Sequence, residues 1–151
     1  MNNLIKIFVV IFLIFPTILY SKDILKAKEG ITWDSENQEY VATGSVEYES
    51  SDIKILSDYI KAKYQIENDK EIFNEIEIKG NIQIFYNEEI YYSDYGLYLK
   101  PKNIIELYDN VKIVSEDRIL KGDELIIDLK NNTRTMSTSK KESVVEVFIN
   151  E

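Results

Sequence analysis

The sequence contains no cysteine and no histidine. Thiol and imidazole nucleophiles, the commonest general base and the usual zinc or haem ligands are therefore missing. Proline occurs twice and glycine five times in 151 residues, and no stretch shows sustained helical periodicity. Because little chemistry is left to such a chain, we predict that it is not an enzyme and uses no cofactor or metal.

Basic residues are outnumbered by acidic residues. Lysine and arginine number 18 against 27 aspartates and glutamates, which gives a net charge of −9. Nucleic acid phosphates would be repelled by this charge, so we predict no nucleic acid partner. The content of 44% hydrophobic and 30% charged residues is ordinary for a folded protein, and the length predicts one domain.

A long uncharged run occurs only at the N-terminus. Residues 7–20 carry no charge and follow a single lysine. This run is shorter than the roughly 20 apolar residues of a membrane span, and Ser21 is small enough to precede a cleavage site. We therefore predict a signal peptide at residues 1–21 and a mature domain at 22–151. An uncleaved inner-membrane anchor remains the alternative, since two apolar residues before the lysine extend the run.

The mature sequence is dominated by alternation of apolar and polar residues. From Ile76 to Ile84 the alternation is unbroken and places four isoleucines on one face. About ten such segments follow one another at hairpin spacing, beginning with a first strand at residues 24–33 and ending with a last strand at residues 144–149. The sequence therefore predicts an all-β fold.

Three of the segments are copies of one pattern, in which a small residue plus Asp lies fourteen positions after a glycine or aspartate. The copies start 36 and then 29 residues apart, which is typical of repeated supersecondary units. Each copy predicts a long hairpin with one apolar face, and such hairpins bury that face in a sandwich, an open jelly roll or a short solenoid. The three copies are Gly44-Ser45-Val46 with Ser57-Asp58, Gly80-Asn81-Ile82 with Ser93-Asp94, and Asp109-Asn110-Val111 with Gly122-Asp123.

Asp58, Asp94 and Asp123 have two interpretations. Repeated carboxylates could bind calcium or act in acid–base chemistry. Equal spacing in every copy favours a structural role, in which each aspartate shapes a bend and accepts local backbone N–H bonds. A change in apolar parity between Ile55 and Ile60 supports this interpretation, because it predicts a β-bulge at the first aspartate.

The aromatic side chains also leave two interpretations open. They could form a platform for sugar rings, or they could pack within the sheet as good strand residues. Tyr98 is favoured for ligand contact because it takes the repeat position of Ala62 and Ile127, and Trp33 is predicted to plug one end. The aromatic cluster consists of Phe85, Tyr86, Tyr91, Tyr92, Tyr95 and Tyr98.

The repeated motifs resemble the LptA (OstA-like) family of periplasmic lipopolysaccharide-transport proteins. The resemblance rests on Ala42-Thr43-Gly44-Ser45-Val46, Lys79-Gly80-Asn81-Ile82 and Leu120-Lys121-Gly122-Asp123-Glu124-Leu125. It implies an open twisted β-jelly roll of repeated antiparallel hairpins that shields lipid acyl chains and helps to bridge the two membranes. The chain lacks a clear basic cluster for lipid phosphates, since Lys54, Lys61 and Lys63 are predicted to form a solvated face.

The resemblance further implies lipopolysaccharide as ligand, LptC-like and LptD-like proteins as partners, head-to-tail self-association and a periplasmic location. An anchored LptC-like protein and a secreted carbohydrate-binding or structural β-repeat module remain alternatives. The predicted acyl-chain contacts are Val46, Ile60, Ala62, Ile78, Ile82, Ile84, Tyr98, Leu107, Val111, Ile113, Leu125 and Ile127.

Overall fold

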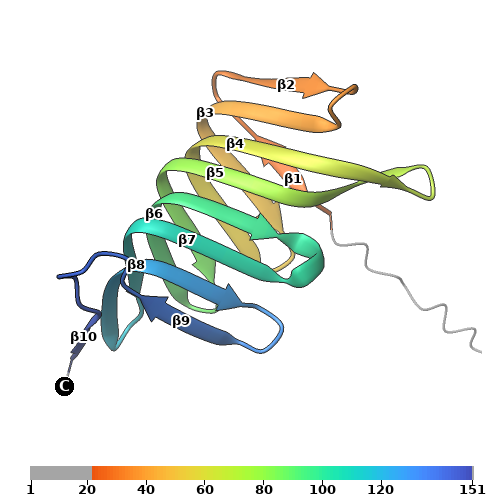
Figure 1. Ribbon diagram of the computed structural model, residues 1–151. Helices are drawn as coiled ribbons and strands as arrows, with labels where there is room; N and C mark the ends of the chain where they lie inside the picture. The colour runs from red at the N-terminus through yellow and green to blue at the C-terminus, as the bar shows by residue number, and fades with distance from the viewer. Residues whose placement is uncertain (1–21, 151) are drawn as a thin grey trace, which may run out of the picture.

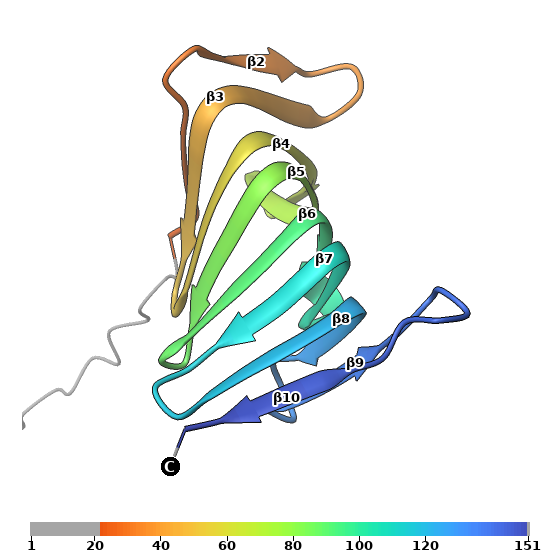
Figure 2. The same cartoon turned by 90° about the vertical axis from the view of Figure 1, so that its left-hand side faces the viewer.

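The computed structural model describes residues 22–150 as one long antiparallel sheet that is folded over on itself (Figures 1 and 2). The strand order is β1-β3-β4-β5-β6-β7-β8-β10, with β2 also paired to β3 and β9 also paired to β8. The predicted signal peptide at 1–21 lies outside the described residues. The strands are β1 (Ile24–Lys26), β2 (Gly30–Asp34), β3 (Glu39–Ser50), β4 (Ile53–Glu67), β5 (Lys70–Tyr86), β6 (Glu89–Leu99), β7 (Ile104–Val114), β8 (Arg118–Asp128), β9 (Thr133–Ser137) and β10 (Glu146–Ile149).

Each long strand is interrupted by a bulge near its middle, and the bulges line up from strand to strand as a crease. The register shifts lie at the predicted repeat motifs, for example between Thr43 and Val46 on β3. Bulges bend a strand and increase its twist, so an aligned row of them folds the sheet. The prediction of a bulge at Asp58 is confirmed by the register shift between Leu56 and Tyr59.

The crease requires left-handed backbone conformations, which explains the residue types of the repeat. Glycine adopts positive φ at little cost, and Asn and Asp do so more readily than other residues. The third copy replaces the glycine with aspartate and keeps the conformation. The φ values are 76° and 48° at Gly44 and Ser45, 76° and 47° at Gly80 and Asn81, and 63° and 53° at Asp109 and Asn110.

The crease divides the sheet into two layers. Layer A contains β2, β9 and, from each long strand, the half on the same side of the crease as these two strands. Layer B contains β1, β10 and, from each long strand, the half on the opposite side of the crease. The apolar faces of the two layers meet inside, and the turns between strands form two rims on the side away from the crease. We call this side the open side. The architecture confirms the predicted open, all-β jelly roll of repeated hairpins.

The predicted first strand at residues 24–33 is two strands instead of one. β1 pairs with one half of β3 and β2 with the other half. The connection between them passes the crease, where the backbone N–H of Lys28 donates to the Gly44 carbonyl over 2.7 Å. At the other end of the chain, the predicted last strand forms as β10 and pairs with β8.

Strand β6 ends at Leu99, two residues before a proline. Pro101 lies in a short 3₁₀ turn, η1 (Lys100–Lys102), which is followed by Asn103 in the left-handed conformation with φ 55°. Proline cannot donate to a sheet ladder, so it ends the strand. This turn fixes Lys100 on the layer A rim.

Candidate functional site

The apolar interior between the two layers is the principal candidate site. All twelve residues predicted to contact acyl chains lie in it, and none is more than 5% exposed. The structure therefore brings them together in one core, while their contact with lipid stays a prediction. Other buried members of the same core were not among those predicted contacts: Ala42, Tyr48, Ile53, Ile55, Ile76, Tyr91 and Ile105.

The interior side chains form continuous rows across the strands. The row near the crease in layer A starts at the exposed Ile31 of β2, and the corresponding row in layer B ends at the exposed Val147 of β10. The apolar lining therefore continues to both ends of the sheet. The first row is Ile31, Ala42, Ile60, Ile78, Gly96, Leu107, Leu125 and Met136. The second row is Leu25, Tyr48, Ile55, Ile84, Tyr91, Ile113, Leu120 and Val147.

The repeated aspartates support the crease. Asn81 Nδ2 donates to Asp58 Oδ2 over 2.7 Å, and Asn110 Nδ2 donates to Asp94 over 2.6 Å. The prediction that these aspartates accept local backbone N–H bonds is wrong for Asp58 and Asp94. Each accepts a hydrogen bond from an asparagine side chain of the neighbouring strand instead. Asp123 does accept a backbone N–H, from the distant Ser139. Within residues 22–150, no cluster of three or more carboxylates could hold a metal ion.

The aromatic cluster is divided between the two faces of the sheet. Tyr91 and Tyr98 point inward and are buried, whereas Tyr92 and Tyr95 alternate with them on the outer face. One continuous sugar platform is therefore not formed. Tyr98 pairs with Ile76 and Ile105 in the same row as Ala62 and Ile127, as the repeat predicts.

The prediction that the Trp33 side chain closes one end of the interior is wrong. Its indole Nε1 donates to the Tyr64 hydroxyl over 3.0 Å and its ring stacks on Tyr40. The side chain is nevertheless 58% exposed on β2, since no further strand formed by residues 22–150 covers this end. Trp33 is an edge residue that leaves the interior open.

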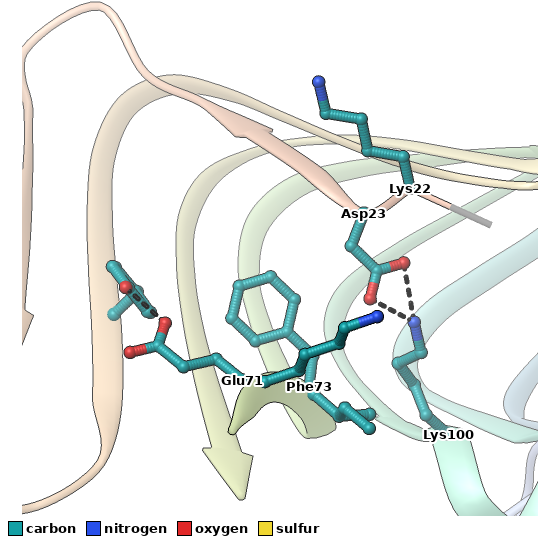
Figure 3. A pocket seen from close by; sticks show the side chains of 8 residues that line it. Lys22, Asp23, Glu71, Phe73 and Lys100 are labelled. Atoms are coloured by element: carbon teal, nitrogen blue, oxygen red, sulfur yellow. Dashed lines mark hydrogen bonds and ion pairs between the residues drawn. The ribbon is translucent and has the colours of Figure 1, made fainter. Parts of the chain in front are cut away.

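Two cavities lie on the open side, at the margin of the interior. Cavity 1 has a volume of about 580 Å³, and Phe73, Tyr40 and three lysines line it (Figure 3). Cavity 2, of about 310 Å³, lies between the turns of the two rims and reaches Tyr98. Of the twelve predicted contacts, Tyr98 alone lines either cavity. Cavity 1 is lined by Lys22, Asp23, Tyr40, Lys70, Glu71, Ile72, Phe73 and Lys100, and cavity 2 by Ser50, Ser51, Asp52, Ile53, Tyr86, Tyr98, Asn103, Leu129 and Lys130.

Two polar clusters join the rims across the open side. In the first clasp, Lys100 of layer A binds Asp23 of layer B over 2.6 Å and the Tyr48 hydroxyl over 2.9 Å. In the second clasp, Arg134 of β9 binds Glu89 of β6 over 2.7 Å, and its Nε donates to the Tyr91 hydroxyl over 2.8 Å. Neither clasp could be predicted from the sequence, because the partners are distant residues at strand ends.

The tyrosines beside the clasps and cavities are held in the neutral form. Burial raises the pKa of the Tyr48 and Tyr91 hydroxyls, and the hydrogen bond to Glu89 adds to the effect at Tyr91. Burial also raises the pKa of Tyr98 to about 12. At Tyr40, the hydrogen bond to Glu71 raises the pKa to about 12. These hydroxyls therefore serve as fixed neutral donors and acceptors at ordinary pH.

These features define a class: an open β-jelly roll with an apolar interior, with cavities along its open side and exposed apolar residues at both ends, and suited to holding apolar chains. The sequence matches the family described as LptA/(LptD N-terminal domain) LPS transport protein over residues 26–133, and the chain belongs to this family. Within residues 22–150, no helix is long and apolar enough to cross a membrane.

The fold is shared with a solved structure. LptH from Pseudomonas aeruginosa, the LptA homologous periplasmic component of its lipopolysaccharide transport device, aligns with a TM-score of 0.75 and 14% sequence identity. The alignment covers 87% of this chain and 96% of LptH. No curated protein sequence gives a significant match.

Proposed function

We propose that this protein is a periplasmic lipopolysaccharide-transport protein whose interior shields acyl chains during their passage between the membranes. Membership of the LPS transport family supports this function. The observation that carries it is the apolar interior, which has two cavities along its open side and exposed apolar residues at both ends.

The interior suits acyl chains because its lining is almost wholly aliphatic and aromatic. Burying one methylene yields ~0.8 kcal/mol, so a fully buried chain of about a dozen carbons would gain on the order of 10 kcal/mol. Several such chains would bind too tightly to be passed on. An interior open along one side buries only part of each chain, which keeps the lipid transferable.

The edges of the sheet support head-to-tail self-association and docking of LptC-like and LptD-like partners. β10 carries Val147, Phe148 and Ile149, which are 54%, 47% and 72% exposed, and β2 carries Ile31 and Trp33, which are 44% and 58% exposed. A free strand edge accepts a further strand. Because the two edges differ, their pairing is heterologous and extends into a filament, in which the interiors of successive copies align.

The test of the proposed function is the chemistry of the lipid that copurifies with the full chain. We expect solvent extraction and mass analysis to recover lipopolysaccharide with its acyl chains. A glycan without acyl chains would instead favour a carbohydrate-binding module, and the loss of all bound amphiphile from a folded sample would contradict the proposal. Intact mass of the same sample shows whether residues 1–21 are retained, as an LptC-like anchored protein requires.

A further inference from the structure

The first clasp uses all the hydrogen-bonding capacity of one lysine. Lys100 Nζ lies 2.7 and 2.6 Å from the two carboxylate oxygens of Asp23. It lies 2.9 Å from the Tyr48 hydroxyl and 3.4 Å from Ser50 Oγ. The Lys100 and Asp23 side chains are only 18% and 19% exposed. An ammonium has three donors, so the chain itself satisfies this cation completely.

The first clasp also separates the two cavities. Asp23 and Lys100 line cavity 1, and Ser50, which contacts Lys100, lines cavity 2 together with Tyr98. Figure 3 shows Asp23 and Lys100 pointing toward each other at the edge of cavity 1, with the Phe73 ring beside them. Separation of this pair would therefore join the two cavities along the open side.

The partners in the first clasp differ in how firmly the fold holds them. Lys100 lies in the 3₁₀ turn that contains Pro101. Asp23 directly precedes β1, a strand of three residues that pairs only with β3 among the described residues. In the second clasp both charged residues lie within paired strands, β6 and β9. The backbone at Asp23 is thus held by less pairing than the backbone on either side of the second clasp, so the first clasp opens more readily by movement of the chain.

The charges around cavity 1 favour an anion once Asp23 leaves. Its lining includes Lys22, Lys70 and Lys100 against Asp23 and Glu71, although the chain as a whole has a net charge of −9. Glu71 already accepts a hydrogen bond from the Tyr40 hydroxyl over 2.7 Å. Leaving a partly buried Lys100 unpaired is costly, so a group that displaces Asp23 must itself be anionic.

We propose that Asp23 occupies the place of a lipid's anionic group, and that Lys100 selects anionic over neutral amphiphiles. This inference rests on the proposed function. The anionic group, a phosphate or a carboxylate, exchanges with Asp23 on Lys100, while the attached chain enters the joined cavities beside Phe73. One ion pair replaces another, so the cation stays paired throughout.

The experiment compares two fluorescent probes on the full chain freed of copurified lipid. They are 11-(dansylamino)undecanoic acid and its methyl ester, which have the same chain and differ in charge. We expect wild type to prefer the acid. Lys100→Gln should weaken acid binding about tenfold, the value of one charge-assisted hydrogen bond, and leave the ester unchanged. Asp23→Asn should strengthen acid binding, because it removes the internal competitor.

The controls separate selection from folding. Lys100→Arg keeps the charge and should keep the preference for the acid. Glu89→Gln disrupts the second clasp and should leave the ratio of acid to ester affinity unchanged. Inorganic phosphate should not displace the acid probe, because it lacks a chain. Displacement by phosphate would mark an anion site without lipid selectivity and would overturn the inference.

The remaining outcomes distinguish this inference from the proposed function. If both probes bind and the affinity ratio is the same in wild type and Lys100→Gln, the selective role of Lys100 is wrong and the lipid-binding interior stands. If folded wild type binds neither probe, the proposed function fails and the role of Lys100 fails with it.

Discussion

At the residue scale, the crease depends on a few backbone positions that only certain residues tolerate. Gly80 has φ 76°, and a Cβ at this position would lie 2.6 Å from Asp58 Oδ2. The same carboxylate accepts a hydrogen bond from the side-chain amide of Asn81. Glycine is therefore favoured here for two reasons, the left-handed conformation and the close approach of the neighbouring strand.

Gly80→Ala should lower the free energy of unfolding by about 1 to 3 kcal/mol, because alanine is strained at positive φ and its methyl group displaces Asp58. Chemical denaturation monitored by circular dichroism measures the change. Gly30→Ala is the matched control, since no heavy atom lies within 4 Å of a Cβ there, and it should change stability by less than about 0.5 kcal/mol. Equal effects of the two substitutions would show that the crease does not constrain Gly80.

The sequence predicts which residues face inward because side chains alternate between the two faces of a strand, so the apolar set can face only one side or the other. Ile76, Ile78, Ile82 and Ile84 are all buried, as the alternation indicates. The partner of Asp58 could not be predicted in the same way. Its contact with Asn81 depends on how two bulged strands are aligned, and the alternation of side chains carries no information about that.

At the element scale, the two edges of the sheet determine how copies meet. Ile31 of β2 and Val147 of β10 continue the interior rows at opposite ends and are 44% and 54% exposed. A neighbouring copy that extends the sheet would cover both residues and join the two interiors.

Ile31→Glu and Val147→Glu should each weaken self-association about tenfold or more, because a charge placed in an apolar contact is desolvated. Sedimentation velocity over a range of protein concentrations measures this. Ile126→Glu is the matched control, since Ile126 is 48% exposed but lies on an inner strand and faces outward. Association that is unchanged by the edge substitutions would rule out contact through these strands.

The elements themselves are largely predictable, because long alternating segments with turn residues between them specify hairpins. The division of the first segment into β1 and β2 is the exception. Apolar residues continue through Ala27 and Ile31, and only the crease of the folded sheet, where Lys28 contacts Gly44, separates the two strands. A local pattern cannot show where a neighbouring strand will bend.

At the scale of the whole molecule, the fold creates an apolar core, open along one side, that is also a candidate lipid path. The clasps that join its rims link residues far apart in the sequence, such as Asp23 and Lys100, which are separated by 77 positions. No periodicity relates these residues. The interior could therefore be predicted from sequence, whereas the cavities and the clasp between them required the three-dimensional arrangement.

If acyl chains pass along the interior, site-specific photo-crosslinking in lipopolysaccharide-producing cells will capture them from inward-facing positions. A photo-reactive residue is placed at the inward positions Ile82 and Val111 and, as matched controls on the same strands, at the outward positions Lys79 and Lys112. Each variant is first checked for folding by circular dichroism. We expect crosslinks to lipopolysaccharide from the inward pair only. Crosslinks from the outward pair alone would show that acyl chains do not pass along the interior.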